Sequence, residues 1–333
     1  MLFSNDVTAK KIRCAVNAAV AGAWVTLACA PVVISPETSD PGTTWVADEG
    51  GGRVLKINRS CSGVVATSPD LGRPVAVLFD SYKGYCWAAD AEGGRVFRLT
   101  ARGVVEKTLY GFGEPVALAY FPKENAVWVA DRADGKVYKL TERGTISATI
   151  GGLKEPVAVA VDMRQGDVYV ADARAGRIVR YDRSAKPLLS YYGFKNPRAI
   201  AFDSGFGYLW VADTGNGRIV KMKPSSEKVV ESRELKAPTA VAVNPGTGVC
   251  FAADAEAGKI ISLAGNGVLR WTNDEYRRPA ALAANAADAS VSVADAYDFE
   301  VAKLKGNTGK PGDYKSVAGF ANPVALHGDP GTR

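Results

Sequence analysis

The segment LWVADTGNGRIVKM, residues 209–222, places the carboxylate of Asp213 five positions before the guanidinium of Arg218, with a glycine-rich turn between them. A carboxylate held this way can serve as a catalytic acid or base, and a glycine-rich turn can bind an anion through its backbone N–H groups. The same pair can also staple a tight turn, because Asp side chains accept hydrogen bonds from nearby backbone N–H groups. The rest of the chain decides between these roles.

The motif around Asp213 recurs along the chain as an aromatic residue, two small apolar residues and an aspartate. The aspartates are separated first by 42 residues and then by 41: Asp48, Asp90, Asp131, Asp172, Asp213, Asp254 and Asp295. Six of them are followed five positions later by a cation: Arg53, Arg95, Lys136, Arg177, Arg218 and Lys259. A catalytic carboxylate is rarely needed seven times, so these pairs are predicted to staple turns.

A second landmark keeps step with the aspartates. A proline lies sixteen residues before each aspartate from Asp90 onward: Pro74, Pro115, Pro156, Pro197, Pro238 and Pro279. Each unit then contains four short apolar runs, exemplified by PVAVAV, VYVAD, RIVRYD and PLLSYYG, separated by turn residues. Four short strands in about forty residues are typical of a β-propeller blade, so the chain is predicted to be all-β.

The two ends of the repeat region predict how the ring closes. NPVALHGDPGTR, residues 322–333, begins an innermost strand but lacks the aspartate strand that should follow. DPGTTWVAD, residues 40–48, supplies an aspartate strand without an innermost strand before it. We therefore expect the C-terminal strand to complete the first blade, giving a seven-bladed propeller over residues 41–333 that leaves few exposed sheet edges.

The first thirty residues differ from the rest. Lys10, Lys11 and Arg13 precede the uncharged run CAVNAAVAGAWVTLACA, as in an export signal. VTLAC resembles the lipobox of bacterial lipoproteins, which predicts lipidation of Cys29, a short tether over residues 31–40, and a periplasmic or cell-surface protein that touches the membrane only through its lipid. Cleavage after ACA, which would give a secreted protein, is the alternative.

Charge and cysteine content limit the partners. Removing residues 1–28 lowers the formal charge from +6 to about +4. A positive charge this small does not favour binding to nucleic acid. We also expect the protein to be a monomer. Cys61, Cys86 and Cys250 remain, an odd number that does not fit a full disulfide framework. Cys86 and Cys250 are predicted to be buried, and a bridge between Cys61 and Cys86 stays open.

The units resemble NHL repeats, a propeller family whose blades read as proline, alternating small and large apolar residues, VAD, a turn and Arg-Ile or Arg-Val. PVAVAVD, VYVADARAGRIVRYD and LWVADTGNGRIVKM carry the resemblance, which covers about residues 40–333 and implies the propeller fold. It implies no single activity, because the family includes lyases, sensor domains and protein or RNA binders. Its amidating lyases and the virginiamycin B lyases rely on histidines, whereas this chain has only His327.

We expect functional residues at positions of the repeat where the residue type differs from blade to blade. The residue before each proline lies in the loop leading to an innermost strand, beside the axial channel: Arg73, Glu114, Glu155, Asn196, Ala237, Arg278 and Asn322. Glu114, Glu155 and Asn196 come from consecutive blades, and such oxygen ligands suit Ca²⁺ or Mg²⁺. The alternative is that they are solvated rim residues. Arg73, Arg278 and Asn322 are predicted to face a ligand from the rim.

Two functions follow from this pattern. The first is an exported scaffold that binds a protein or an extracellular polymer without turnover, since a multi-histidine site cannot be built. The alternative is a metal-assisted hydrolase or lyase, similar to lactonases, with Glu114 and Glu155 as metal ligands or base. In the seventh unit Ser292 replaces the aromatic residue and Glu300 the cation, which predicts a loosened blade or a partner-binding loop.

Overall fold

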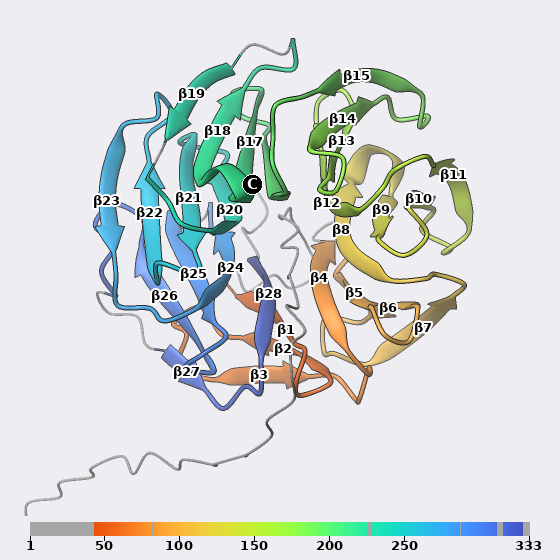
Figure 1. Cartoon of the computed structure of the whole chain (residues 1–333). Helices are drawn as coiled ribbons and strands as arrows, with labels where there is room; N and C mark the ends of the chain where they lie inside the picture. Colours follow the sequence, from red (N-terminus) through yellow and green to blue (C-terminus); the bar gives the residue numbers. More distant parts are fainter. Residues whose placement is uncertain are drawn as a thin grey trace, which may run out of the picture.

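The computed structural model describes residues 43–80, 83–225, 228–232, 234–286, 288–311 and 316–328. Their strands form seven four-stranded antiparallel sheets arranged around a ring, which confirms the all-β, seven-bladed propeller (Figure 1). The export segment, the tether and the lipidation site Cys29 lie outside the described residues. Within those residues, no helix is long and apolar enough to cross a membrane.

Each blade is built from four strands, named below from the innermost strand outward. Blade 1 is β28 (Pro323–Gly328), β1 (Thr44–Asp48), β2 (Arg53–Ile57) and β3 (Val64–Thr67). Blade 2 is β4 (Pro74–Asp80), β5 (Tyr85–Asp90), β6 (Arg95–Leu99) and β7 (Val105–Tyr110). Blade 3 is β8 (Pro115–Phe121), β9 (Ala126–Asp131), β10 (Lys136–Leu140) and β11 (Ile146–Ile150), with the 3-10 turn η1 (Pro122–Glu124) after β8. Blade 4 is β12 (Pro156–Val161), β13 (Val168–Asp172), β14 (Arg177–Tyr181) and β15 (Pro187–Tyr191).

The remaining three blades follow the same order. Blade 5 is β16 (Pro197–Asp203), β17 (Tyr208–Asp213), β18 (Arg218–Met222) and β19 (Lys228–Ser232), with the 3-10 turn η2 (Thr214–Asn216) after β17. Blade 6 is β20 (Pro238–Asn244), β21 (Val249–Asp254), β22 (Lys259–Leu263) and β23 (Leu269–Asn273). Blade 7 is β24 (Pro279–Ala284), β25 (Ser290–Asp295), β26 (Glu300–Lys305) and β27 (Ser316–Ala318).

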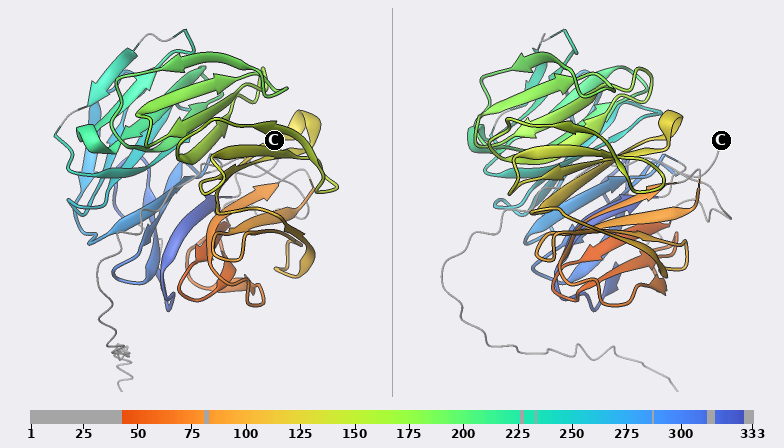
Figure 2. Two further views of the ribbon diagram at one scale, coloured as in Figure 1. Left: turned by 45° about the vertical axis from the view of Figure 1, so that its right-hand side comes forward. Right: turned by 90° about the vertical axis from the view of Figure 1, so that its right-hand side faces the viewer.

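The core lies between adjacent blades, whose twisted sheets pack against each other around the ring (Figure 2). The aromatic residues of the repeated motif are buried: Trp45, Trp87, Trp128, Tyr169, Trp210 and Phe251 are each at most 2% exposed. Trp128 of blade 3, for example, shares a cluster with Val159 and Val161 of blade 4. These rings fill the wedge between sheets and are not available to stack on a ligand.

Closure occurs in blade 1, as predicted. β28 pairs antiparallel with β1, so that His327 lies opposite Trp45 and Gly328 opposite Thr44 (Figure 1). The pairing joins the last described strand of the chain to the first. No blade is left incomplete, because each of the seven sheets has four strands within the described residues.

A ring of cations on the third strands was not predicted. One cation lies eight residues after each aspartate except in blade 6: Lys56, Arg98, Lys139, Arg180, Lys221 and Lys303. Five of them donate to a backbone carbonyl of the next blade, as when Lys221 Nζ bonds the Gly265 oxygen at 2.5 Å and Lys303 Nζ bonds the Arg59 oxygen at 3.0 Å. In blade 6, where Ser262 takes this position, Trp271 Nε1 donates to the Gly306 carbonyl at 2.9 Å. These bonds tie neighbouring blades together.

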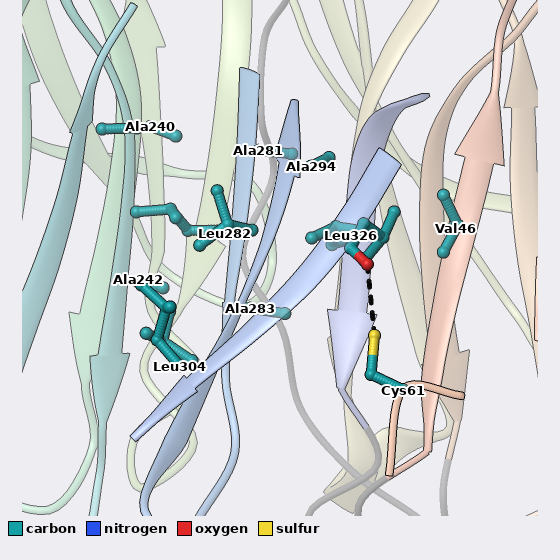
Figure 3. Close-up of a cluster of buried hydrophobic side chains, with 14 of the residues drawn as sticks. Val46, Cys61, Ala240, Ala242, Ala281, Leu282, Ala283, Ala294, Leu304 and Leu326 are labelled. Atoms are coloured by element: carbon teal, nitrogen blue, oxygen red, sulfur yellow. Dashed lines mark hydrogen bonds between the residues drawn. The ribbon is translucent and has the colours of Figure 1, made fainter. Parts of the chain in front are cut away.

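Cys61, Cys86 and Cys250 are buried free thiols, so the bridge between Cys61 and Cys86 is not formed. Cys61 lies at the junction of blades 7 and 1, where its Sγ donates to the Val301 carbonyl at 3.2 Å, the dashed line in Figure 3. Burial raises the pKa of Cys61 to about 11, so its thiol is protonated at neutral pH. In the same region Ser292 replaces the aromatic residue and bonds Thr44 through their hydroxyl groups at 3.1 Å, which keeps this blade interface closed.

Candidate functional site

Asp213 and Arg218, which raised the question of catalysis, form a turn staple. Asp213 is fully buried, and its Oδ1 accepts the backbone N–H of Lys195 at 2.7 Å. Its Oδ2 accepts Arg218 Nε at 2.7 Å and Asn216 Nδ2 at 2.8 Å. With both oxygens engaged by fixed donors, this carboxylate holds the loop and has no room to exchange a proton with a ligand.

The same arrangement recurs around the ring. The predicted pairing with the cation five positions later is confirmed for the four arginines, Arg53, Arg95, Arg177 and Arg218. Lys136 departs from it, since its Nζ lies 3.9 Å from Asp134 rather than pairing with Asp131. We call the side of the ring that carries these turns, together with the loops leading to the innermost strands, the aspartate face.

Glu114, a predicted metal ligand, is paired with a cation on the aspartate face. Arg132, the residue after the blade 3 aspartate, donates through Nε to Glu114 Oε2 at 2.8 Å and through Nη2 to Glu114 Oε1. The Arg132 backbone N–H also bonds the Glu114 carbonyl at 2.9 Å, which fixes the pair. Donating these hydrogen bonds to Glu114 raises the pKa of Arg132, so the guanidinium stays charged.

Glu155, the second predicted ligand, is paired with Arg198 of blade 5 at 3.5 Å. Arg198 follows Pro197 at the β-bulge between β16 and β17, a position where other blades have valine, threonine or alanine. Only 8% of Arg198 is exposed, and burial lowers its pKa although Glu155 acts in the opposite direction. Three consecutive blades thus share one charged cluster, formed by Glu114, Arg132, Glu155 and Arg198.

Sequence reasoning missed Arg132 and Arg198, which neutralise the two glutamates. The signal for Arg198 was present in NPRAIAF, where an arginine stands at a position that is uncharged in every other blade. A buried cation at a repeated apolar position is costly unless a carboxylate compensates it. That rule alone would have pointed to a partner for Arg198.

The other predicted rim residues have different surroundings. Arg73 Nε pairs with Glu49 Oε1 at 2.5 Å, and Asn322 Nδ2 donates to Glu49 Oε2 at 2.8 Å, so Glu49 links both across the closure. Asn196 is half-buried with a left-handed backbone, at φ 50°. Arg278 is exposed on the aspartate face. The structure therefore joins Glu114 and Glu155 to arginines and leaves Arg278 open to solvent.

The proposed Ca²⁺ or Mg²⁺ site at Glu114, Glu155 and Asn196 stays a prediction. Among the described residues, no group of three or more histidine, cysteine or acidic side chains could hold a metal ion. The proposed site has only two acidic side chains, with an asparagine as the third ligand, so this finding does not apply to it. A cation would have to compete with Arg132 and Arg198 for the same carboxylate oxygens.

His327 is packed in the ring. The side chain is fully buried, and both imidazole nitrogens are without a hydrogen-bond partner among the described residues. Its ring meets Phe79 edge-on, with centroids 6.5 Å apart. Burial lowers the pKa of His327 to about 3, so the imidazole is neutral at physiological pH. Because the side chain is fully buried, it does not reach a ligand on the surface.

Comparisons with known proteins agree on the fold. No family model and no curated protein matches this chain. Among solved structures, a functionally unknown protein from Desulfotomaculum acetoxidans aligns with a TM-score of 0.74 and 11% identity, covering 86% of this chain and 100% of that one. Hydrazine synthase from Kuenenia stuttgartiensis gives 0.72 and 13%, covering 86% and 99%.

A catalytically inactive virginiamycin B lyase from Staphylococcus aureus, solved with quinupristin, gives a TM-score of 0.66 and 16% identity, covering 78% of this chain and 89% of that one. At such low identity these likenesses show the fold alone, and the NHL-type resemblance stays a prediction. The neighbours include a lyase and a protein of unknown function. The chain is accordingly a seven-bladed β-propeller that resembles the virginiamycin B lyase and hydrazine synthase propellers.

Proposed function

We propose that this propeller is an exported binding module whose aspartate face holds a protein or an extracellular polymer without chemical turnover. One observation carries the proposal: the two carboxylates best placed for catalysis, Glu114 and Glu155, are each ion-paired with an arginine. A general base needs an oxygen free to take a proton, and both glutamates are engaged by permanent cations. A pre-paired cluster instead offers fixed donors and acceptors to a polar ligand.

Export and lipid anchoring belong to the same proposal. The support is the sequence of residues 1–30, with Cys29 as the lipidation site and secretion as the alternative. Blade scaffolds of this size present a broad face of loops, which suits a large partner better than a small substrate. Metabolic labelling with a palmitate analogue, compared between the native chain and Cys29→Ser, tests the anchor directly.

The second candidate is a metal-assisted hydrolase or lyase at the channel mouth. It is favoured by the placement of two glutamates on consecutive blades, where the charge of Glu155 acts on both Arg132 and Arg198. A divalent cation that displaced the guanidinium groups would find two carboxylates, with Asn196 at the equivalent position of the next blade. Lactones and esters are the substrates to screen in that case.

Calorimetry on the chelator-treated full chain separates the candidates. We expect no stoichiometric uptake of Ca²⁺ or Mg²⁺, no lactone or ester hydrolysis, and recovery of any bound polymer unchanged. The test pair is Glu114→Gln with Glu155→Gln, and the matched control is Glu92→Gln with Glu256→Gln, two exposed glutamates on the aspartate face. Metal uptake that disappears only in the first pair would replace the binding proposal with the enzyme.

A further inference from the structure

The side of the ring opposite the aspartate face carries many exposed cations, and we call it the basic face. Two kinds of turn lie there: inner turns join the innermost strand of a blade to the second, and outer turns join the third strand to the fourth. The exposed cations of the outer turns are Arg59, Arg102, Arg143, Arg183, Lys186 and Lys310. Those of the inner turns are Lys83, Lys123 and Arg164.

The more exposed acids of the basic face are paired with cations of the same face. Glu124 is paired with Lys139 and also lies 3.8 Å from Arg183. Glu142 lies 3.5 Å from Lys83. Each of these contacts joins one acid to a cation that has no other acid beside it, so the pairs leave the remaining cations uncompensated.

The other acids on this side are more enclosed. Asp288 is paired with Lys303 at 2.8 Å, and Asp182 accepts the backbone N–H groups of Ser184 and Lys186. The rest are Glu106, which pairs with Arg98, and the buried Asp80, Asp162, Asp167 and Asp203. The nine exposed cations are joined by the six cations of the third strands, five of which donate to carbonyls of the outer turns. Within the described residues, cations on this side therefore outnumber the nine acids.

The aspartate face has no such excess. Exposed acids occupy the same loops as its exposed cations, as Glu234 does with Lys236 and Glu275 does with Arg277. Further exposed acids in its loops and turns are Asp70, Glu92, Asp134, Glu256, Asp274 and Asp298. The positive charge of the propeller is therefore concentrated on the basic face.

The chain enters the ring at the basic face. β1 begins at Thr44, opposite Ile57 at the start of the Arg59 turn, and it ends at Asp48 on the aspartate face. The first described residue, Thr43, therefore lies on the basic side. Cys29, the expected lipidation site, precedes Thr43 by fourteen residues. Such a segment spans at most about 50 Å when fully extended, so a lipid on Cys29 would hold the membrane near the basic face.

We propose that the basic face docks on a membrane surface that contains anionic phospholipids. The proposal goes beyond the binding function above and takes from it only the anchor at Cys29. An anionic lipid surface attracts lysine and arginine side chains that come within about 10 Å, the range over which salt does not screen them. The sequence alone predicted contact through the lipid only, and the charge distribution adds a second contact. Docked in this way, the ring presents its aspartate face away from the membrane, toward a partner.

The placement of the cations favours a membrane over nucleic acid, the other common polyanion. The outer turns of four consecutive blades each contribute an arginine: Arg59, Arg102, Arg143 and Arg183. They follow the rim of the ring over more than half of its blades. A broad anionic surface can meet all of them at once, and it is also the anion nearest to the entry of the chain at Thr43.

The test measures vesicle binding by the full chain carrying Cys29→Ser, which removes the anchor from the measurement. Vesicles of equal parts phosphatidylglycerol and phosphatidylcholine are compared with vesicles of phosphatidylcholine alone. We expect phosphatidylglycerol to increase binding and added salt to abolish the increase. The triple variant Arg102→Gln, Arg143→Gln, Arg183→Gln should reduce the increase by about tenfold or more. The matched control Lys154→Gln, Lys195→Gln, Lys236→Gln removes the same charge from exposed positions of the aspartate face and should change it by less than about twofold.

A variant with the opposite effect keeps the test independent of folding. Glu142→Gln removes an acid from the basic face and should tighten binding to the mixed vesicles, whereas Glu256→Gln on the aspartate face should leave it unchanged. Equal loss in both triple variants, no increase with phosphatidylglycerol, or no gain from Glu142→Gln would each overturn the proposal.

Two further results separate this proposal from its neighbours. Displacement of the protein from the mixed vesicles by oligothymidylate, at a lower phosphate concentration than that of the vesicles, would overturn membrane docking and assign the basic face to nucleic acid. Vesicle binding with the expected variant effects, but without acyl labelling of Cys29 in the native chain, would support the docking face and remove the anchor.

Discussion

Asp48 and Asn322 are 274 residues apart in sequence, yet Asp48 Oδ1 accepts the backbone N–H of Asn322 at 2.7 Å. The same oxygen accepts the N–H of Ala321 at 2.9 Å. In blade 3 the equivalent contact joins Asp131 to Glu114 over only 17 residues. The staple that shapes each loop in the ring therefore also closes it.

The first prediction concerns this closure. Asp48→Ala should lower the free energy of unfolding by about 1–3 kcal/mol, because two partly buried backbone N–H groups lose their acceptor. Urea denaturation followed by tryptophan fluorescence measures the change. Glu256→Ala, which removes an exposed carboxylate from another turn, serves as the control and should stay within about 0.5 kcal/mol of the native chain. Equal stability of the two variants would show that the closure bond is dispensable.

The second prediction concerns His327. The folded-state pKa of about 3 lies below the ordinary value of 6.5, so between these pH values the unfolded chain binds a proton that the folded one excludes. The free energy of unfolding should therefore fall as pH decreases below 6.5, by at most about 1.4 kcal/mol per pH unit from this residue.

His327→Leu should remove that dependence, because leucine has no titratable group. Leucine should also fit this position, since Leu78 occupies the equivalent position opposite Trp87 in blade 2. Urea denaturation at several pH values between 7.5 and 4.5, on both proteins, gives the difference in slope. The subtraction cancels groups common to both, such as Asp80, whose pKa burial raises to about 6. Parallel curves for the two proteins would contradict the buried neutral imidazole.

The third prediction concerns the cation ring. Lys221 is 4% exposed, bonds the Gly265 carbonyl in the next blade and lies over the rings of Tyr208 and Trp210, at 3.8 and 5.2 Å from their centroids. Lys221→Met keeps the apolar stem but leaves that carbonyl unpaired, so stability should fall by about 1–3 kcal/mol. Lys221→Arg should recover most of it, because Arg98 and Arg180 fill this position elsewhere. Thermal unfolding of both variants checks the order, with exposed Lys186→Met as the control.

The fourth prediction concerns strain in blade 7. Phe299→Gly should raise the free energy of unfolding by about 1 kcal/mol, because glycine adopts φ 57° without steric cost. The reciprocal change, Gly217→Ala, should destabilise, since a Cβ there would lie 2.3 Å from the Leu235 carbonyl oxygen. Calorimetric melting of the two variants gives both signs. Destabilisation by Phe299→Gly would mean that the phenyl ring contributes more to packing than its conformation costs.

The features predicted from sequence are those that repeat locally. Pro74 and Asp90 pair directly across two adjacent strands, and the same distance along the chain recurs in every later blade. The spacing therefore reports a backbone contact that each unit makes by itself. Closure by β28 could be inferred for the same reason, because the missing half of one unit had to be supplied by the other end.

Most of the contacts that were missed join neighbouring blades, although Arg132 pairs with Glu114 of its own blade. Arg198 meets Glu155 across 43 residues, and Lys221 reaches a carbonyl 44 residues ahead. The repeat of about 41 residues shows which positions carry an unusual residue type, but it does not show which atom each side chain contacts. Even within one turn the partner can differ, as the contact of Lys136 with Asp134 shows. Export, lipidation and metal binding stay predictions, because they concern residues or ligands beyond the described chain.

Opposing Thr44 to Gly328 makes the described chain nearly a closed loop. A short peptide bridge between these residues would leave every blade with its four strands, and new ends could then be opened in an exposed turn such as that around Lys186. In such a circular permutant, blade 1 would be formed by one continuous segment, and blade 4 would instead be formed by strands from both ends of the chain. Which blade holds the ends is thus a matter of gene order, whereas the order of loops around the aspartate face is set by the fold.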